Sequence, residues 1–233
     1  MGISNDQYFY YGTTRKIVSV FGAMFNDIYT ARKLEDGTLT NTARVPLSYG
    51  PRSKFLSRIR EETQLSNTQS KIAIKLPRMS FEIVSLTYDT NTKLQKGITR
   101  TLPSENPTKK QSILYPTTYR IGFQLNVLAK NQDDALQILE QILPYFQPEY
   151  TVTVKEVNNN FKSDIPFTIQ AVTLVDDYEG DFMSRRSIIY TLEFEARVKF
   201  YGPLREGNII KNSGVSFSDP AMTSEGLPYT SQQ

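Results

Sequence analysis

Apolar residues occupy every second position along a long segment near the end of the chain. They are Ile188, Tyr190, Leu192, Phe194, Ala196, Val198 and Phe200. The positions between them are mostly polar, namely Ser187, Thr191, Glu193, Glu195, Arg197 and Lys199. A period of two residues over this length is typical of a β-strand with one covered face and does not fit an amphipathic helix. The chain must therefore build a sheet that covers one face of this strand, while the other face meets solvent or a partner.

Other segments supply further strands for this sheet. Residues 119–127 show the same alternation, and strand-like composition marks residues 71–76, 79–88, 150–154 and 165–171. Near the N-terminus, residues 29–34 and 43–49 flank a turn signal at Glu35-Asp36-Gly37. This pattern predicts a hairpin with a loose loop. Pro46 favours an edge position in it, because proline has no backbone N–H to donate.

Three segments have helical periodicity. Residues 14–29 place apolar side chains at steps of three and four, with Thr13 or Thr14 as the expected N-cap. A short helix with a wet basic face is expected from Pro51 to about Gln64. A third helix should begin at Asn131, followed by Asp133 and Asp134, and stop at Pro144. Its expected apolar stripe consists of Leu136, Ile138, Leu139, Ile142 and Leu143.

Two stretches have little apolar content. Residues 89–118 are rich in Thr, Asn, Lys, Ser and Pro, which predicts a long loop without regular structure, and such loops are often functional or disordered. Beyond Pro203 the chain has too few aliphatic residues to offset its ordering entropy alone. We therefore expect a single domain over residues 1–202 and an extended C-terminal tail over residues 203–233.

The order of the predicted elements favours an α+β fold. The expected architecture is a largely antiparallel β-sheet with helices packed on one side, a long basic loop and an extended C-terminal tail. Leu139 and Phe194 are expected in its core. If they are buried, replacing either by alanine should cost about 2 to 5 kcal/mol of unfolding free energy.

Composition makes most catalytic mechanisms improbable. Among the 233 residues there is no histidine and no cysteine, so the usual neutral-pH general base, thiol nucleophiles, disulfides and the common zinc, copper and haem ligands are missing. The formal net charge of +3 is well short of that of a dedicated nucleic-acid binder. No apolar run approaches the roughly 20 residues that span a bilayer, and no secretory signal is readable, so neither membrane insertion nor export is expected.

A search for catalytic or metal-binding motifs finds no strong candidate. Phosphate-binding glycine loops and serine nucleophile motifs are missing from the sequence. The acidic cluster Asp176, Asp177, Glu179 and Asp181 lacks the order of an EF-hand loop. A solvated acidic turn is the better interpretation, and a hydrolase that uses Asp176 or Asp181 would need metal-dependent activity. We expect no catalytic residue, no metal and no cofactor.

Three clusters are candidates for contact with a partner or with another subunit. The loop at residues 89–118 carries Lys93, Lys96, Arg100, Lys109 and Lys110. Protein contact is favoured over nucleic acid there, because no aromatic residues interleave the charges for base stacking. Arg185 and Arg186 precede the last long strand and could form an intersubunit pair with a carboxylate. Tyr8 and Tyr10 belong to an aromatic opening segment and are the best candidates for exposed contact aromatics.

Several strings, in their order along the chain, resemble a known family. They are Tyr8-Phe9-Tyr10, Arg44-Val45-Pro46-Leu47-Ser48-Tyr49, Gln141-Ile142-Leu143-Pro144-Tyr145-Phe146-Gln147-Pro148, Asp164-Ile165-Pro166-Phe167, and Ser184-Arg185-Arg186 leading into Leu192-Glu193-Phe194-Glu195. The chain is similar, from about residue 8 to residue 202, to the tail sheath stabiliser and completion proteins, the tail terminators of T-even-type contractile-tailed bacteriophages. The Gln141 to Pro148 string is the most specific part of the resemblance.

The resemblance implies a non-enzymatic virion protein, assembled in the host cytoplasm. Such a protein forms a hexameric ring at the head-proximal end of the tail, caps the tube and the last sheath ring, and presents a surface to the neck. Its implied partners are further copies of itself, the tail sheath and tail tube proteins and the neck proteins, with DNA only in passage through the ring. The alternative from another class is a nucleic-acid-binding accessory protein that uses the basic loop at residues 89–118.

Overall fold

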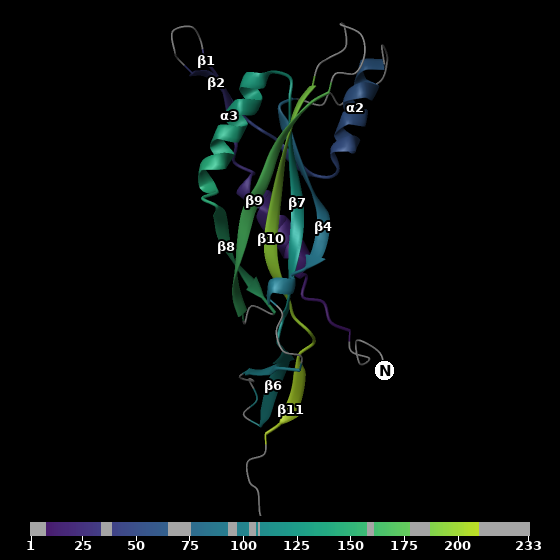
Figure 1. Ribbon diagram of the computed structural model, residues 1–233, viewed down its shortest axis with the longest axis vertical. Coiled ribbons are helices and arrows are strands. Elements are labelled where there is room, and N and C mark those ends of the chain that lie inside the picture. Colours follow the sequence, from purple (N-terminus) through teal and green to yellow (C-terminus); the bar gives the residue numbers. More distant parts are fainter. Residues whose placement is uncertain are drawn as a thin grey trace, which may run out of the picture.

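A six-stranded sheet forms the body of the protein in the computed structural model (Figure 1). The structure describes residues 8–33, 39–64, 76–92, 97–102, 106, 108–157, 161–177 and 187–209. The strand order is β3 (Leu47–Tyr49), β4 (Arg78–Tyr88), β7 (Thr117–Ala129), β10 (Ser187–Phe200), β9 (Phe161–Asp177) and β8 (Glu149–Glu156). All neighbours in this sheet are antiparallel except β3 and β4. The predicted α+β fold on a largely antiparallel sheet is confirmed.

The core lies between one face of this sheet and helix α1 (Thr13–Met24), which runs behind the strands in Figure 1. Phe21 of α1 is fully buried and stacks on Phe123 of β7, with 4.4 Å between the ring centroids. The rings of Phe81 and Phe194 surround it at 5.3 and 5.4 Å. The covered face of β10 is therefore the predicted one, and burial of Phe194 and Leu139 is confirmed.

Helix α3 (Gln132–Ile142) covers the upper part of the same face, over β7 and β10. Its buried side chains are Asp134, Ala135, Ile138, Leu139 and Ile142, with Asn131 at the N-cap. The prediction that Leu136 and Leu143 belong to the apolar stripe is wrong, since both are 41% exposed. The spacing of Ala135, Ile138, Leu139 and Ile142 explains this result, because positions i, i+3, i+4 and i+7 share a face.

The N-terminal hairpin is confirmed, with a corrected second arm. Strand β1 (Tyr29–Lys33) pairs with β2 (Leu39–Arg44), whereas residues 47–49 leave the hairpin and form β3 at the edge of the large sheet, directly after Pro46. The predicted turn at residues 35–37 and the predicted strand at residues 71–75 lie outside the described residues. Helix α3 holds β1 through Gln137, whose side-chain oxygen accepts a 2.9 Å bond from Ala31 N.

The predicted N-cap of α1 is also corrected. The cap is Gly12, with φ of 65°, and Thr13 is the first helical residue. Glycine suits this position because its lack of a Cβ removes the cost of the left-handed conformation. Helix α2 (Arg52–Gln64) is confirmed, and it lies beside the β3–β4 edge, where the guanidinium of Arg78 stands 5.0 Å from the ring centre of Phe55.

A second, three-stranded sheet lies at one end of the elongated molecule (Figure 1). It follows a short 3₁₀ helix η1 (Thr90–Thr92) and has the order β11 (Arg205–Asn208), β6 (Lys109–Leu114) and β5 (Thr99–Leu102). The prediction of a loop without regular structure over residues 89–118 is therefore wrong for these residues. The tail that was expected to be extended from residue 203 begins with β11, which is ordered by its pairing with β6.

The second face of the large sheet is less exposed than the sequence suggests. Thr191 was expected on the wet face of β10, but it is buried and its hydroxyl donates a 3.0 Å hydrogen bond to Asn126 Oδ1. Further along this face, Arg120 lies between the buried carboxylate of Asp89, at 3.9 Å, and that of Glu195, at 3.6 Å. Asp89, expected in a loop, is thus fixed at the end of β4.

Candidate interaction surfaces

The aromatic segment before α1 divides into exposed and anchored residues. Tyr8 and Tyr10 are 90% and 68% exposed, as expected for contact aromatics. Tyr11 instead packs against the small cluster of Leu102, Ile113 and Val157, and its hydroxyl donates a 3.0 Å bond to the carbonyl of Gly202. One anchored ring therefore holds the segment on the body while two neighbouring rings face solvent.

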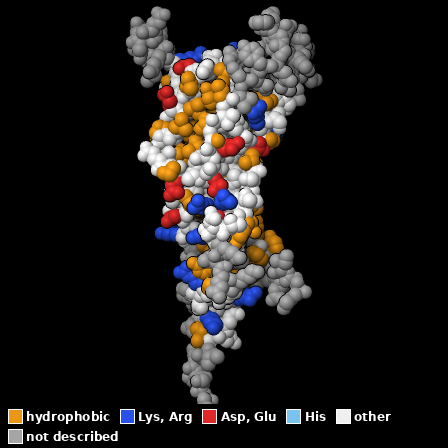
Figure 2. All heavy atoms as spheres, in the orientation of Figure 1, with side chains coloured by type: hydrophobic (Ala, Val, Ile, Leu, Met, Phe, Trp, Pro, Cys, Tyr) orange, Lys and Arg blue, Asp and Glu red, His pale blue; other side chains and the backbone are white. Residues whose placement is uncertain are grey.

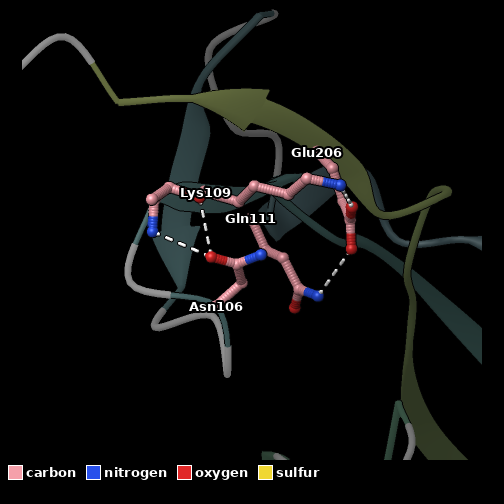
Figure 3. A network of polar contacts seen from close by, with 5 residues as sticks. Asn106, Lys109, Gln111 and Glu206 are labelled. Carbon is pink, nitrogen blue, oxygen red and sulfur yellow. Dashed lines mark hydrogen bonds and ion pairs between the residues drawn. The ribbon is translucent and has the colours of Figure 1, made fainter.

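The three predicted basic residues that the structure describes lie on the small sheet. Lys109 on β6 pairs with Glu206 on β11 at 3.3 Å, and Gln111 donates to the other carboxylate oxygen of Glu206 at 3.2 Å (Figure 3). These two hydrogen bonds and the charge of Lys109 lower the pKa of Glu206. Arg100 is opposite Ile113 in the register and shares a face with Lys109, while Lys110 alternates to the other face. The sheet thus divides these charges instead of concentrating them on one face.

The remaining predicted contact residues cannot be placed. Lys93, Lys96, Arg185 and Arg186 lie outside the described residues. The acidic cluster is divided in the same way, with Asp176 and Asp177 at the end of β9 and Glu179 and Asp181 outside the described part of the chain. Within the described ranges, no three acidic side chains come together in a way that could hold a metal ion. None of the described helices is both long and apolar enough to cross a bilayer.

A groove of about 430 Å³ lies where the ends of α1 and α3 meet β8. Its walls comprise Met24, Phe25, Asp27, Ile28, Glu140, Gln141, Ile142, Pro144, Tyr145, Phe146 and Tyr150. Tyr145, in the 3₁₀ turn η2 (Leu143–Tyr145), is 68% exposed at its rim. The string from Gln141 to Pro148, singled out by its resemblance to a family, therefore builds one wall. Figure 2 shows hydrophobic side chains gathered over α3 and the upper part of the sheet.

Sequence reasoning missed a buried carboxylate at the junction of the two sheets. Glu156, the last residue of β8, is only 1% exposed. Burial raises its pKa, whereas a hydrogen bond with Tyr201 and the charges of Lys199 and Lys16 oppose this rise. Burial and the charge of Glu156 together raise the pKa of Tyr201 to about 12. The signal was present, because Glu156 continues the inward-facing positions of Val152 and Val154 on β8.

Replacing Glu156 by glutamine should therefore stabilise the protein at neutral pH. A raised pKa in the folded state means that ionisation costs stability as the pH rises above 4.5, the ordinary value, towards the folded-state value. Glutamine keeps an oxygen for the Tyr201 hydroxyl and carries no charge. We expect a gain of about 1 kcal/mol at pH 7 that disappears below pH 4. Thermal melts of both proteins across this range measure it, and a gain that persists at low pH would contradict the assignment.

Comparisons with known proteins agree with the resemblance drawn from the strings. The family described as T4-like virus Myoviridae tail sheath stabiliser matches residues 8–232 of the chain. The tail completion protein gp15 of Enterobacteria phage T4 is 30% identical over 224 residues, which cover 90% of this chain and 78% of that protein. The family match includes the aromatic segment, the groove and both sheets.

Proposed function

Because the chain belongs to the T4-like virus Myoviridae tail sheath stabiliser family, we propose that it forms a ring that caps the head-proximal end of a contractile phage tail. The ring, a homohexamer, ends the growth of tube and sheath by occupying their terminal interface. It holds the end of the sheath during contraction and connects the tail to the neck. The protein acts by binding and makes or breaks no covalent bond.

The family match over residues 8–232 carries this proposal, since it extends over nearly the whole chain. The relative from phage T4 is named for tail completion, and its similarity also spans most of both chains. The proposed partners are the tail sheath protein, the tail tube protein and the neck proteins. DNA crosses the ring only in passage, and a net charge of +3 is compatible with a lumen that does not retain it.

Negative-stain microscopy of the purified protein, alone and mixed with tube and sheath assemblies, tests the proposal. We expect six-fold rings, and density for the protein at one end only of each assembly. Native mass spectrometry should give the mass of a hexamer. Persistent monomers that bind neither tube nor sheath would contradict the proposal, as would binding along the whole length of the sheath.

We propose that Tyr8 and Tyr10 contact a neighbouring subunit or the sheath. Exposed tyrosines with one anchored neighbour lose little conformational freedom on binding, and buried tyrosines are common hot spots of interfaces. The double change Tyr8→Ser and Tyr10→Ser should weaken assembly at least about tenfold and shift the melting temperature little, because both side chains are exposed. Titration of ring or sheath binding by light scattering measures the loss.

Tyr11→Phe is the matched control for this variant. It removes only the hydroxyl that donates to Gly202, so it should lower thermal stability while leaving affinity for partners within about twofold. Unchanged assembly of the double serine variant would remove the aromatic segment from the interface.

A further inference from the structure

The six-stranded sheet leaves part of each edge without a partner strand among the described residues. On one side β3 pairs with Met79 to Phe81 only, so the outer edge of β4 is unpaired over residues 82–88. On the other side β8 pairs with β9 only up to Thr168, so the outer edge of β9 is unpaired from Gln170 onward. Figure 1 shows β8 beside the lower part of β9 only. Helix α3 makes its main sheet contacts with β7 and β10.

Neither edge carries the charges or prolines that protect sheet edges in monomers. Residues 83–88 read Ile-Val-Ser-Leu-Thr-Tyr and residues 170–175 read Gln-Ala-Val-Thr-Leu-Val, with no charge and no proline in either. Exposed edges in monomeric proteins are usually blunted by lysine, proline or bulges. Bulges do lie between Ile83 and Ser85 on β4 and at Gln170 on β9. Beyond them, β4 pairs regularly with β7 as far as Tyr88, and β9 pairs regularly with β10 from Ala171 to Asp177. Within the part of the chain that the structure describes, both segments are therefore available to another strand.

Exposed apolar side chains of both edges lie on the core face of the sheet, whereas Val84, at the bulge in β4, lies on the other face beside Gly122. Leu86 is opposite the buried Ile121, and Val172 is opposite the buried Leu192. Leu86 is 58% exposed, and Leu174, which shares a face with Val172, is 49% exposed. If the two edges paired, these side chains would bury one another and continue the core across the junction.

The directions of the strands fit such a junction between two copies. Each step from β4 to β7, β10 and β9 is antiparallel, so β4 and β9 run in opposite directions. In a ring whose axis makes the same acute angle with the strands of every copy, β9 of a neighbour therefore meets β4 antiparallel. This contact joins two different patches, and such heterologous contacts close rings.

The two free segments lie at different heights, which requires a stagger between copies. Across the sheet, Leu86 is opposite Ile121, which is opposite Ala196, which in turn is opposite Phe167 of β9. The middle of the free β9 segment, at Thr173, lies six residues further along that strand. Six residues of strand correspond to an offset of about 20 Å. The four strands from β4 to β9 are together about as wide, so this offset per copy tilts the strands by about 45° from the axis of the assembly. Strands in closed barrels tilt by about 35 to 45°. With this stagger, β3 of one copy and β8 of the next lie beyond opposite ends of the paired segments, so neither strand blocks the pairing.

We propose that the free edge of β9, residues 170–175, pairs antiparallel with the free edge of β4, residues 83–88, of a second copy of this chain. The contact repeats around the assembly and joins the six-stranded sheets into one continuous sheet. This inference rests on the proposed function for the existence of a closed assembly, and it adds the strands that build it.

Engineered cysteines test the junction directly, because the natural chain contains no cysteine. The variants Leu86→Cys and Val172→Cys, which the proposed ranges place opposite each other, are purified separately and oxidised alone and as a mixture, with Leu86→Cys plus Leu174→Cys for a register shifted by two residues. Residues opposite each other in an antiparallel pair have Cα atoms about 5 Å apart, within disulfide range. We expect covalent dimers only in a mixture, and a ladder of oligomers from the variant that carries both cysteines of the reactive pair. Ser57→Cys on the exposed side of α2, mixed with Leu174→Cys, should give none.

A charge on either edge gives an independent readout. Leu86→Lys and Leu174→Lys should each lower the hexamer population at least about tenfold in native mass spectrometry, with the circular dichroism spectrum unchanged. Ile98→Lys, on a residue 42% exposed before β5, should leave the hexamer intact.

The outcomes separate this inference from the proposed function. Hexamers that form no cross-link in any mixture, or that persist in both lysine variants, would overturn the edge pairing and leave the ring in place. Cross-linked dimers from Leu86→Cys alone would show a symmetric contact and also overturn it. Monomers without cross-links, at concentrations where the wild-type protein caps sheath, would do the same. Cross-linked rings that bind no sheath would support the pairing and contradict the proposed function.

Discussion

Replacing Phe21 by alanine should cost about 3 to 5 kcal/mol of unfolding free energy. Phe21 is fully buried and surrounded by aromatic rings. The ring centres within 5.9 Å of its own belong to Phe25, Phe81, Phe123, Phe167 and Phe194. Removing the ring leaves a cavity between α1 and the sheet that these five neighbours cannot all move to fill. The cost is therefore expected near the upper end for aromatic truncation.

Urea denaturation measures this loss as a fall in the midpoint with little change in the m-value. Ser19→Ala, on the exposed side of the same helix, is the matched control and should change stability by less than about 0.5 kcal/mol. Phe21→Leu should fall between the two. A loss below about 1 kcal/mol for Phe21→Ala would show that α1 does not form the centre of the core.

Replacing Asn126 by aspartate should cost about 3 to 5 kcal/mol at pH 7, because the new carboxylate would be ionised in a fully buried position. Asn126 has no exposed surface, and its side-chain oxygen already accepts the hydroxyl of Thr191. Burial raises the pKa of such a carboxyl in the folded state. The penalty should therefore be nearly absent below pH 4 and grow as the pH rises, since only the ionised form is disfavoured.

Thermal melts between pH 4 and pH 8 follow this dependence. Gln132→Glu makes the same amide-to-acid change at an exposed position in the first turn of α3, where negative charge is tolerated. It should shift the melting temperature little at any pH. A flat profile for Asn126→Asp would mean that water or a cation reaches this site.

Long periodic segments were predictable because each carries its own pattern. The alternation of β10 and the apolar spacing of α3 identify both the element and most of its buried residues. The strands β5 and β6 could not be recognised in this way. Both strands are short and mostly polar, and β6 gains a second partner only through β11, which lies more than ninety positions later.

The candidate surfaces were predictable only in part, for a related reason. The Gln141 to Pro148 string could be singled out by resemblance, but the groove also needs Asp27 and Tyr150 from other elements. Tyr8 and Tyr10 could be identified as contact aromatics because they belong to an aromatic cluster in an otherwise polar opening segment. The unpaired edges depend on where β3 and β8 end relative to β4 and β9, and register between distant strands leaves no mark in a single sequence.

The two sheets share a pair of continuous chain segments, which has a mechanical consequence. Strand β6 leads into β7 through Tyr115 and Pro116, and β10 leads into β11 through residues 201–204, so an antiparallel ribbon runs through both sheets. A pull along the long axis loads the hydrogen bonds of this ribbon in shear, many at once, instead of peeling them apart one by one. A protein built in this way resists tension best along its own length.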